Sequence, residues 1–226
     1  MIDVDIKKKN LKAVIFDLDG VLVSTDNCHY QGWKKLSDEL GIPFDRAANE
    51  KFRGVDRMSC LEMLLADYKV IAQEEKIALA TRKNDYYLEL IKTLSPADIL
   101  PGATELLDQL DEQKVKKAVG SASKNAVIVL ERLGIAERFD TIVTGSDYER
   151  GKPAPDVFLT AAKRIGVPPQ NCLVIEDALA GVQAAKAAGM RVLGIGNAAG
   201  LYLADDVVAS LSGITYHYLK ALFDHE

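Results

Sequence analysis

The chain has 226 residues, of which 48% are hydrophobic and 27% charged, and at roughly 150 residues per domain this length fits one domain with an insertion or two small domains. This composition excludes a disordered chain and a collagen-like protein. The 28 basic and 33 acidic residues give a net charge of -5, and the basic run Lys7-Lys8-Lys9 is short, so we do not expect nucleic acid as a partner. An anionic ligand would need a local binding site.

The cysteines and the N-terminal segment indicate a reducing compartment. Cys28, Cys60 and Cys172 are an odd number at wide spacing, which argues against a disulfide framework or a zinc knuckle, and we expect free, buried thiols. The first ten residues carry charges with no apolar segment behind them, and no stretch reaches the roughly 18 apolar residues of a membrane-spanning helix. The sequence therefore predicts a cytoplasmic protein without a membrane partner.

Short apolar runs rich in valine and isoleucine alternate with amphipathic segments along much of the chain. Continuous apolar runs of this length are typical of parallel strands buried on both faces. The strands are predicted at 13–16, 117–119, 141–143, 172–175 and 192–195. The helices are predicted at about 101–113, 124–133, 155–165, 178–188 and 215–223, and Gly134, Gly166 and Gly189 close three of them.

About 100 residues separate the first strand from the second, which is too many for a single crossover connection. The segment 26–94 has a helical pattern, with helices predicted at about 27–40, 57–67 and 73–93 and a break at Gly41-Ile42-Pro43. The sequence thus predicts an α/β fold, a Rossmann-like parallel sheet flanked by helices. Residues 1–24 and 95–226 would form this core, and residues 25–94 a helical cap domain inserted after the first strand.

Two carboxylates close the first predicted strand. It ends in Phe16-Asp17-Leu18-Asp19-Gly20, which places Asp17 and Asp19 at the C-terminal edge of the sheet, where open α/β folds bind their ligands. An aspartate there can attack a phosphoryl group and form an aspartyl-phosphate. An isolated Asp-x-Asp is more often a solvated turn, so this interpretation depends on the motifs that follow.

A second acidic pair lies at the same edge, because the strand predicted at 172–175 runs into Glu176-Asp177. At about 4 Å and an effective dielectric near 20, each like-charged pair of carboxylates costs about 4 kcal/mol. A bound dication would remove this cost, and Mg²⁺ suits the site because it takes carboxylate and phosphate oxygens. The sequence therefore predicts a magnesium site made by Asp17, Asp19, Glu176 and Asp177.

Two loops offer groups for an anion. The segment Ser121-Ala122-Ser123-Lys124-Asn125 joins a strand to a helix start, where hydroxyls, a lysine and free N–H groups can cradle a phosphate. Two prolines fix the loop Gly151-Lys152-Pro153-Ala154-Pro155 that carries the Lys152 ammonium. Taken alone, Ser123 would be a helix N-cap and Lys152 a solvated lysine; the ordered set of motifs favours phosphate binding.

In this order the four motifs resemble those of the haloacid dehalogenase superfamily of phosphotransferases, over nearly the whole chain. Within that superfamily the chain is most similar to the β-phosphoglucomutases. The residues behind this closer resemblance are Thr25 with His29 and Trp33, the segment Arg53-Gly54-Val55-Asp56-Arg57, Arg82-Lys83-Asn84, and Ser121-Ala122-Ser123-Lys124-Asn125. A generic phosphatase of the fold would not need these details.

The resemblance implies specific roles at the sheet edge. Asp17 would be the phosphorylated nucleophile and Asp19 the acid and base for the sugar oxygens. Mg²⁺ would be held by Asp17, the Asp19 carbonyl and Asp177. Glu176 would either bind the metal or contact the residues that bind it. We expect Asp19 to be protonated only in a closed, phosphorylated state, because an unperturbed aspartate (pKa about 3.9) is ionised at neutral pH.

The resemblance also implies a set of substrate contacts. Ser121 and Lys152 would hold the phosphoryl group in transfer, and Arg57 would grip a second phosphate together with the 123–125 segment. The residues expected to bind the substrate or control cap closure are Thr25, His29, Trp33, Arg53, Gly54, Val55, Arg57, Lys83, Ala122, Ser123, Lys124 and Asn125. A closing cap is expected because an aspartyl-phosphate must be protected from water.

The implied reaction is isomerisation of β-D-glucose 1-phosphate to β-D-glucose 6-phosphate through β-glucose 1,6-bisphosphate, which also serves as activator, in a Mg²⁺-dependent monomer. One alternative is a Mg²⁺-dependent phosphatase for small sugar phosphates that uses the same Asp17 and Lys152. Another is a catalytically silent protein that senses a sugar phosphate at the sheet edge, against which the intact carboxylate set argues.

Two segments depart from the pattern of the family. Ser24 stands where many relatives carry an acidic residue, near the hinge into the cap. The loop Thr144-Gly145-Ser146-Asp147-Tyr148-Glu149-Arg150 is also unlike the loop expected in a β-phosphoglucomutase. This loop is closer to that of generic hydrolases of the superfamily. The first nine or so residues are an extension to which the resemblance assigns no role.

Overall fold

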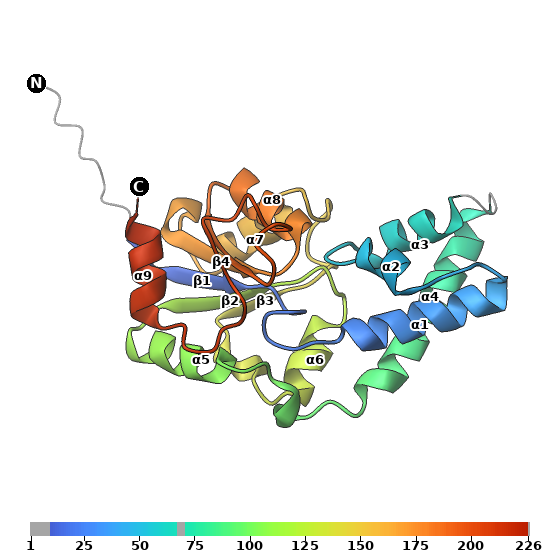
Figure 1. The fold of residues 1–226 in the computed structure, drawn as a ribbon, viewed down its shortest axis with the longest axis horizontal. Coiled ribbons are helices and arrows are strands. Elements are labelled where there is room, and N and C mark those ends of the chain that lie inside the picture. The colour runs from blue at the N-terminus through green and yellow to red at the C-terminus, as the bar shows by residue number, and fades with distance from the viewer. Residues whose placement is uncertain (1–9, 67–70, 226) are drawn as a thin grey trace, which may run out of the picture.

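A computed structural model describes residues 10–66 and 71–225, so the Lys7-Lys8-Lys9 run and the other N-terminal residues lie outside the described residues. The centre of the fold is a parallel sheet with the strand order β3-β2-β1-β4-β5-β6 (Figure 1). The strands are β1 (Ala13–Phe16), β2 (Lys116–Gly120), β3 (Thr141–Val143), β4 (Cys172–Glu176), β5 (Arg191–Ile195) and β6 (Asp206–Val208). The strand β1 lies near the middle, between β2 and β4.

The five predicted strands are confirmed to within a residue at either end. The sixth, β6, was not predicted, because it is three residues long and begins with the exposed Asp206. It pairs only with β5, at the edge of the sheet. An edge strand buries little surface, so its sequence need not show an apolar run.

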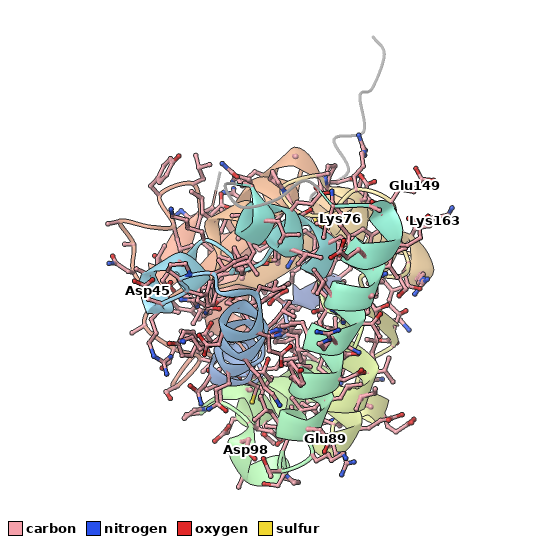
Figure 2. The ribbon with its side chains drawn as sticks, turned by 90° about the vertical axis from the view of Figure 1, so that its right-hand side faces the viewer. Asp45, Lys76, Glu89, Asp98, Glu149 and Lys163 are labelled. Carbon is pink, nitrogen blue, oxygen red and sulfur yellow. The ribbon has the colours of Figure 1, made fainter. Side chains whose placement is uncertain are left out.

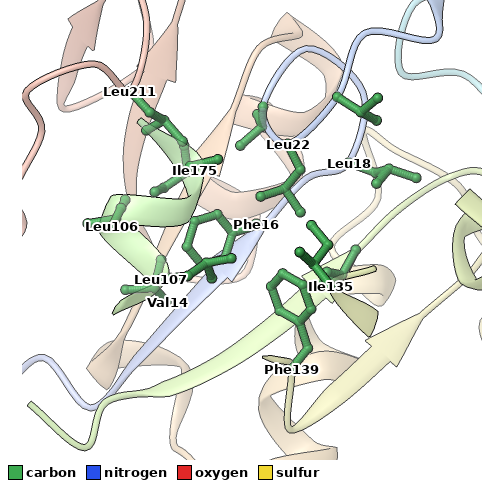
Figure 3. Packing of buried hydrophobic residues seen from close by; sticks show 14 of the residues in the cluster. Val14, Phe16, Leu18, Leu22, Leu106, Leu107, Ile135, Phe139, Ile175 and Leu211 are labelled. Atoms are coloured by element: carbon green, nitrogen blue, oxygen red, sulfur yellow. The ribbon is translucent and has the colours of Figure 1, made fainter. Parts of the chain in front are cut away.

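Helices cover both faces of the sheet. Along β1, Val14 and Phe16 pack into one cluster with α5 (Ala103–Glu112), α6 (Ala126–Arg132) and α9 (Tyr216–Asp224), as Figure 3 shows in part. Ala13 and Ile15 point to the opposite face, against α7 (Asp156–Arg164) and α8 (Leu179–Ala187). This alternation follows from the two-residue period of a strand. It buries all four β1 residues completely and so fixes the position of Asp17 directly behind them.

The insertion between β1 and β2 is helical, as predicted. Its helices are α1 (Asp26–Leu40), α2 (Arg46–Glu50), α3 (Arg57–Leu65) and α4 (Gln73–Ile91). They have their own apolar cluster, built around Trp33, Leu36, Leu61 and Leu79, and they stand beside the end of the core where β1 terminates (Figure 1). Figure 2 views the molecule from this side, with Lys76 near the start of α4 and Glu89 near its end.

The predicted fold class is therefore confirmed: a Rossmann-like parallel sheet with helices on both faces and a helical insertion. The helix α2 was not predicted, since five residues are too few to show a helical period. Short 3-10 turns at Pro96–Asp98, Ala136–Arg138 and Pro169–Asn171 complete the described elements. All three cysteines are free; Cys60 and Cys172 are buried and Cys28 is half-buried. Among the described helices none is long and apolar enough to cross a membrane.

Candidate active site

The C-terminal ends of β1, β2 and β4 border a cavity of about 750 Å³ that the insertion helices close from the other side. The structure brings most of the predicted site residues to its wall. These are Asp17, Asp19, His29, Trp33, Arg53, Gly54, Val55, Arg57, Lys83, Ser121, Ala122, Ser123, Lys124 and Asp177. Thr25, Asn125, Lys152 and Glu176 are buried and do not line the cavity.

A buried lysine joins the two acidic motifs. The Lys152 ammonium donates to Oδ1 of Asp17 at 2.5 Å and to Oε2 of Glu176 at 2.8 Å, and its side chain is fully buried. The other Glu176 oxygen accepts the backbone N–H groups of Asp177 (3.1 Å) and Ala178 (3.0 Å). Glu176 thus fixes the position of the ammonium, which in turn lies against the carboxylate of Asp17.

The acidic groups lie close enough to share a cation. One carboxylate oxygen from each of Asp17, Glu176 and Asp177 lies within 4.8 Å of the other two. Burial raises the pKa of Asp17 to about 7, and the charge of Glu176 adds to this effect. Burial also raises the pKa values of Asp19 and Asp177 to about 6 each. Crowded, partly desolvated oxygen ligands of this kind fit a hard dication such as Mg²⁺.

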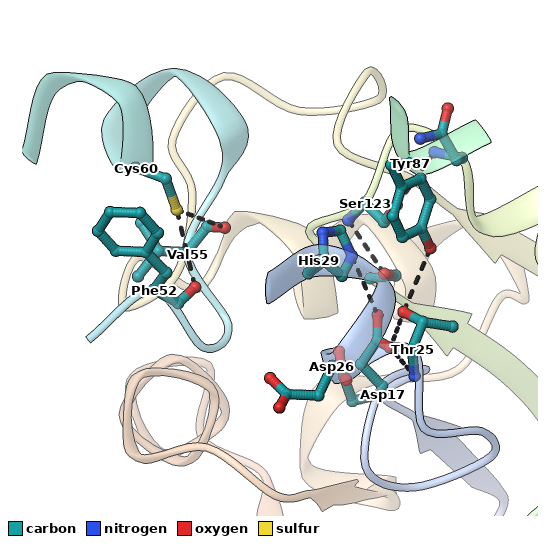
Figure 4. A network of polar contacts seen from close by, with 12 residues as sticks. Asp17, Thr25, Asp26, His29, Phe52, Val55, Cys60, Tyr87 and Ser123 are labelled. Carbon is teal, nitrogen blue, oxygen red and sulfur yellow. Dashed lines mark hydrogen bonds and ion pairs between the residues drawn. The ribbon is translucent and has the colours of Figure 1, made fainter. Parts of the chain in front are cut away.

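The turn after β1 determines where Asp19 lies. Gly20 has φ of 78°, and a Cβ there would come within 1.9 Å of Oδ2 of Asp177. Only glycine therefore lets the two acidic motifs approach so closely. The carboxylate of Asp19 accepts hydrogen bonds from the backbone N–H of Thr25, at 3.0 Å, and from its hydroxyl. Tyr87 of α4 in turn donates to the Thr25 hydroxyl at 3.2 Å (Figure 4).

A lysine–histidine pair faces Asp19 from the insertion. Lys83 is 2% exposed, and its Nζ lies 2.8 Å from Nδ1 of His29. Burial lowers the pKa of Lys83 to about 7, and burial also lowers the pKa of His29 well below its usual value. The imidazole is therefore neutral. Its Nε2 lies 3.9 Å from Oδ2 of Asp19.

The loop after β2 is held by its own hydroxyls. The Ser121 hydroxyl accepts the backbone N–H of Ser123, and the Ser123 hydroxyl accepts that of Asn125, both at 3.1 Å. The side-chain amide of Asn125 donates to Asn84 of α4 at 2.7 Å. One wall of the cavity is thus fastened to the insertion as well as to the sheet.

A second link between insertion and core crosses the acidic side. The guanidinium of Arg53 donates to Oδ2 of Asp177, and a Cβ on Gly54 would lie 3.1 Å from the Cβ of Ala178. Arg53, expected among the substrate contacts, is thus placed on a carboxylate of the predicted magnesium site. Asp177 raises the pKa of Arg53 against the opposing effect of burial.

Comparison with known proteins assigns the chain to a family. The haloacid dehalogenase-like hydrolase family matches residues 11–189, which is more than half of the sequence. The chain belongs to the haloacid dehalogenase-like hydrolases. The superfamily resemblance of the four motifs is therefore confirmed.

Individual members of the haloacid dehalogenase-like family show a closer likeness. The chain is 43% identical to the β-phosphoglucomutase of Bacillus subtilis over 213 residues, 92% of this chain and 94% of that one. Its fold matches a crystal structure of β-phosphoglucomutase from Clostridium difficile with a TM-score of 0.92, at 40% identity over 95% of this chain and 97% of that one. It is also 30% identical to a phosphorylated carbohydrates phosphatase of Thermotoga maritima, over 82% and 85% of the two chains.

Several residues of this haloacid dehalogenase-like site were not predicted, and three of them make contacts within it. Asn84 bonds Asn125, Tyr87 bonds Thr25, and Tyr148 lines the cavity. The motif Arg82-Lys83-Asn84 already contained Asn84, and Tyr148 lies in the 144–150 loop, which was noted only as a departure from the family pattern. Tyr87 is a fully buried helix residue, and nothing in the sequence separates it from ordinary core.

The crowded carboxylates predict that Asp177→Asn stabilises the metal-free protein at high pH. The pKa of Asp177 is about 3.8 in the unfolded chain and about 6 in the folded protein. Its negative charge therefore destabilises the folded state at pH values above this range. We expect Asp177→Asn to raise the free energy of unfolding by about 1–3 kcal/mol at pH about 8 and to leave it nearly unchanged at pH about 3. Urea unfolding in a chelator measures this.

Asp38→Asn, at an exposed position, is the matched control and should change the free energy of unfolding at neither pH. In separate samples without the chelator, Mg²⁺ should raise the melting temperature of the wild type and have a much smaller effect on Asp177→Asn. Equal destabilisation by Asp177→Asn at both pH values would show that charge crowding is absent.

Proposed function

We propose that this protein is a β-phosphoglucomutase that converts β-D-glucose 1-phosphate to β-D-glucose 6-phosphate through the 1,6-bisphosphate. The observation that carries the proposal is a cavity with two separate sets of cationic and hydroxyl groups. Ser121 lines the nucleophile end, where the buried Lys152 is bonded to Asp17, and Arg57 from the insertion, with Ser123 and Lys124, offers a second set. A bisphosphate needs two such sets at once, whereas hydrolysis of a monoester needs one. The similarity to two β-phosphoglucomutases supports the same conclusion.

In the proposed reaction Asp17 carries the phosphoryl group between sugar oxygens. Phosphorylated Asp17 donates its phosphoryl group to O6 of β-glucose 1-phosphate while Asp19 takes the proton from that hydroxyl. The bisphosphate then reorients, and an oxygen of Asp17 forms a bond to the other phosphorus as the bond to O1 breaks. Asp19 returns its proton to O1, and glucose 6-phosphate leaves.

The environment of Asp19 suits this exchange. Its raised pKa, about 6, brings it close to neutral pH, where a group gives and takes protons with comparable ease. In this structure its carboxylate is bonded to Thr25. We propose that binding of the substrate beneath the closed cap frees Asp19 to reach the sugar oxygen, with His29 facing its carboxylate.

The magnesium ion would be held by the carboxylates of Asp17 and Asp177 and by the carbonyl of Asp19. It would neutralise charge on the phosphoryl oxygens and so lower the repulsion that Asp17 meets there. We assign Glu176 to Lys152 and not to the metal, because its two oxygens already accept three hydrogen bonds.

Arg57 is suited to the second phosphate because its charge is unused. Among the described residues no hydrogen bond or ion pair is made by its guanidinium, although it lines the cavity. Burial lowers its pKa, but a guanidinium keeps its proton in proteins. Its planar fork matches two phosphate oxygens.

We propose that residues 25–94 move as one cap over a core formed by 1–24 and 95–226. Two cap–core bonds, Arg53 with Asp177 and Asn84 with Asn125, lie on different walls of the cavity. Both would have to break when the cap opens to exchange its ligand. Each then biases the cap toward the closed state.

Phosphorus NMR tests the proposed activity against hydrolysis. The protein is mixed with Mg²⁺, β-glucose 1-phosphate and a trace of the bisphosphate, and both products are followed. We expect glucose 6-phosphate to form well ahead of inorganic phosphate, and the α anomer to react much more slowly. Inorganic phosphate forming first would favour a phosphatase, the activity named for the Thermotoga maritima relative.

Replacing Arg57 is expected to separate the two activities. Arg57→Ala removes a charge-assisted contact to the second phosphate, and each such contact contributes about 1.5–3 kcal/mol. We expect kcat/KM for the mutase reaction to fall about 10²-fold, while release of phosphate from phosphorylated Asp17 changes little. Arg132→Ala, an exposed arginine on α6, is the control. Unchanged mutase kinetics in Arg57→Ala would show that Arg57 does not bind the second phosphate.

A further inference from the structure

The loop 144–150, which departs from the β-phosphoglucomutase pattern, lies against the loop that binds phosphate in the proposed mechanism. We call residues 121–125 the phosphate loop and residues 144–148 the bracing loop. The Ser121 backbone N–H donates to Val143 at 3.0 Å, and the Gly145 N–H donates to the carbonyl of Ser123 at 3.3 Å. A Cβ on Gly145 would lie 2.4 Å from the carbonyl oxygen of Ala122. The two loops are therefore in direct backbone contact.

The bracing loop is itself rigidly held. One carboxylate oxygen of Asp147 accepts both the backbone N–H of Thr144, at 2.7 Å, and its hydroxyl, at 2.8 Å. The other oxygen accepts from Arg164 of α7 at 2.5 Å. Because α7 packs on the sheet, these bonds fasten the loop to the core and fix the backbone from which Tyr148 projects.

Tyr148 makes the side-chain bond between the loops. Its hydroxyl donates to the carbonyl oxygen of Ser121 at 3.2 Å, and its ring is half-buried against the cluster under α7 while one side lines the cavity. The last ladder pair of β2 and β3 joins Gly120 to Val143, so the Ser121 carbonyl lies beyond the sheet. Tyr148 supplies a donor where the ladder has ended.

This single bond acts on both proposed phosphate sites. The Ser121 hydroxyl belongs to the site beside Asp17, and the same hydroxyl accepts the N–H of Ser123 at the start of the second site. A change in the position of the Ser121 carbonyl therefore moves both ends of the phosphate loop together. A misplacement of about 1 Å can cost about 10²-fold in rate.

We propose that Tyr148 is a positioning residue that holds the phosphate loop in the geometry both phosphates need. The inference rests on the proposed mutase function and adds to it a residue whose hydroxyl acts through Ser121. The hydroxyl is the essential part, because no other atom of Tyr148 bonds the Ser121 carbonyl. The ring contributes only packing at the wall of the cavity.

Kinetics of Tyr148→Phe and Tyr148→Leu test this role. With β-glucose 1-phosphate and the bisphosphate as substrates, we expect Tyr148→Phe to lower kcat about tenfold and to raise KM for the bisphosphate at least threefold. Its melting temperature should stay close to that of the wild type, because the ring remains. Tyr148→Leu should show at least the same kinetic loss. Tyr202→Phe, on a side chain 67% exposed, removes a hydroxyl elsewhere and should change neither constant.

The wild type in the same assay separates this inference from the proposed function, since a wild type without mutase activity would overturn both. With an active wild type, kinetics of Tyr148→Phe within twofold of it would overturn the role of the hydroxyl, even if Tyr148→Leu were impaired. A fall in kcat at unchanged KM, together with a lower melting temperature, would indicate lost folded protein and would also overturn it.

Discussion

Asp17→Asn is expected to lower the turnover number by about 10⁴-fold or more, which is the scale of losing a catalytic nucleophile. The amide has nearly the shape of the carboxylate but lacks the anionic carboxylate oxygen that forms the acyl phosphate. The main-chain position should not change, because the Asp17 N–H is bonded to Ile175 of the neighbouring strand at 2.9 Å. Steady-state kinetics with β-glucose 1-phosphate and the bisphosphate measure the loss.

Two comparisons make this result specific. Asp38→Asn on the exposed face of α1 should keep the wild-type rate. Asp17→Asn should still be folded, because it removes a charge that burial and Glu176 already disfavour and leaves Lys152 paired with Glu176. Turnover of Asp17→Asn within tenfold of the wild type, after checking for deamidation, would exclude covalent catalysis at this residue.

Lys152→Met is expected to damage stability and activity together. Its ammonium is the shared partner of two buried carboxylates, Asp17 and Glu176, and removing one member of a buried ionic set costs about 3–5 kcal/mol. The pKa of Glu176 is already raised by burial, with Lys152 opposing that effect. Loss of a donor to the transferred phosphoryl group should also lower kcat by about 10³-fold.

The stability loss in Lys152→Met should depend on pH in a defined direction. Without the ammonium the folded-state pKa values of both carboxyl groups rise further, so their charges destabilise the folded protein above the unfolded value near 4. We expect the loss in free energy of unfolding to be full at pH about 8 and to shrink as the pH falls toward 4. Lys163→Met, an exposed lysine on α7, is the control. A loss that is constant with pH would mean that Lys152 acts by packing alone.

Much of the fold could be predicted because the central strands are buried on both faces. In β1 and β4 every residue is buried, so each appears in the sequence as an uninterrupted apolar run that ends in the acidic motif. Less could be predicted at the margins. The helix α6 begins at Ala126 and not at 124, since Lys124 and Asn125 belong to the phosphate loop. Glycines at 134, 166 and 189 have φ near 70° and close their helices as expected.

The residues of the candidate site also fall into a predictable and an unpredictable group, for a physical reason. Residues at strand ends could be predicted because the topology of a parallel sheet brings its C-terminal ends together. The contacts of Asn84, Tyr87 and Tyr148 join positions 41, 62 and 27 residues apart in the chain, and no periodic pattern encodes such pairs. The placement of Arg53 on Asp177 is a further case, because it depends on how the insertion meets the core.

Identifying the residue that carries the phosphoryl group is the most direct test of the proposed mechanism. The protein, loaded from β-glucose 1,6-bisphosphate in Mg²⁺, is quenched, reduced with borohydride to trap acyl phosphates, and digested for mass spectrometry. We predict a single modified site, Asp17, in the peptide that follows β1. Modification of a serine, a histidine or another carboxylate, with Asp17 unmodified, would contradict the mechanism.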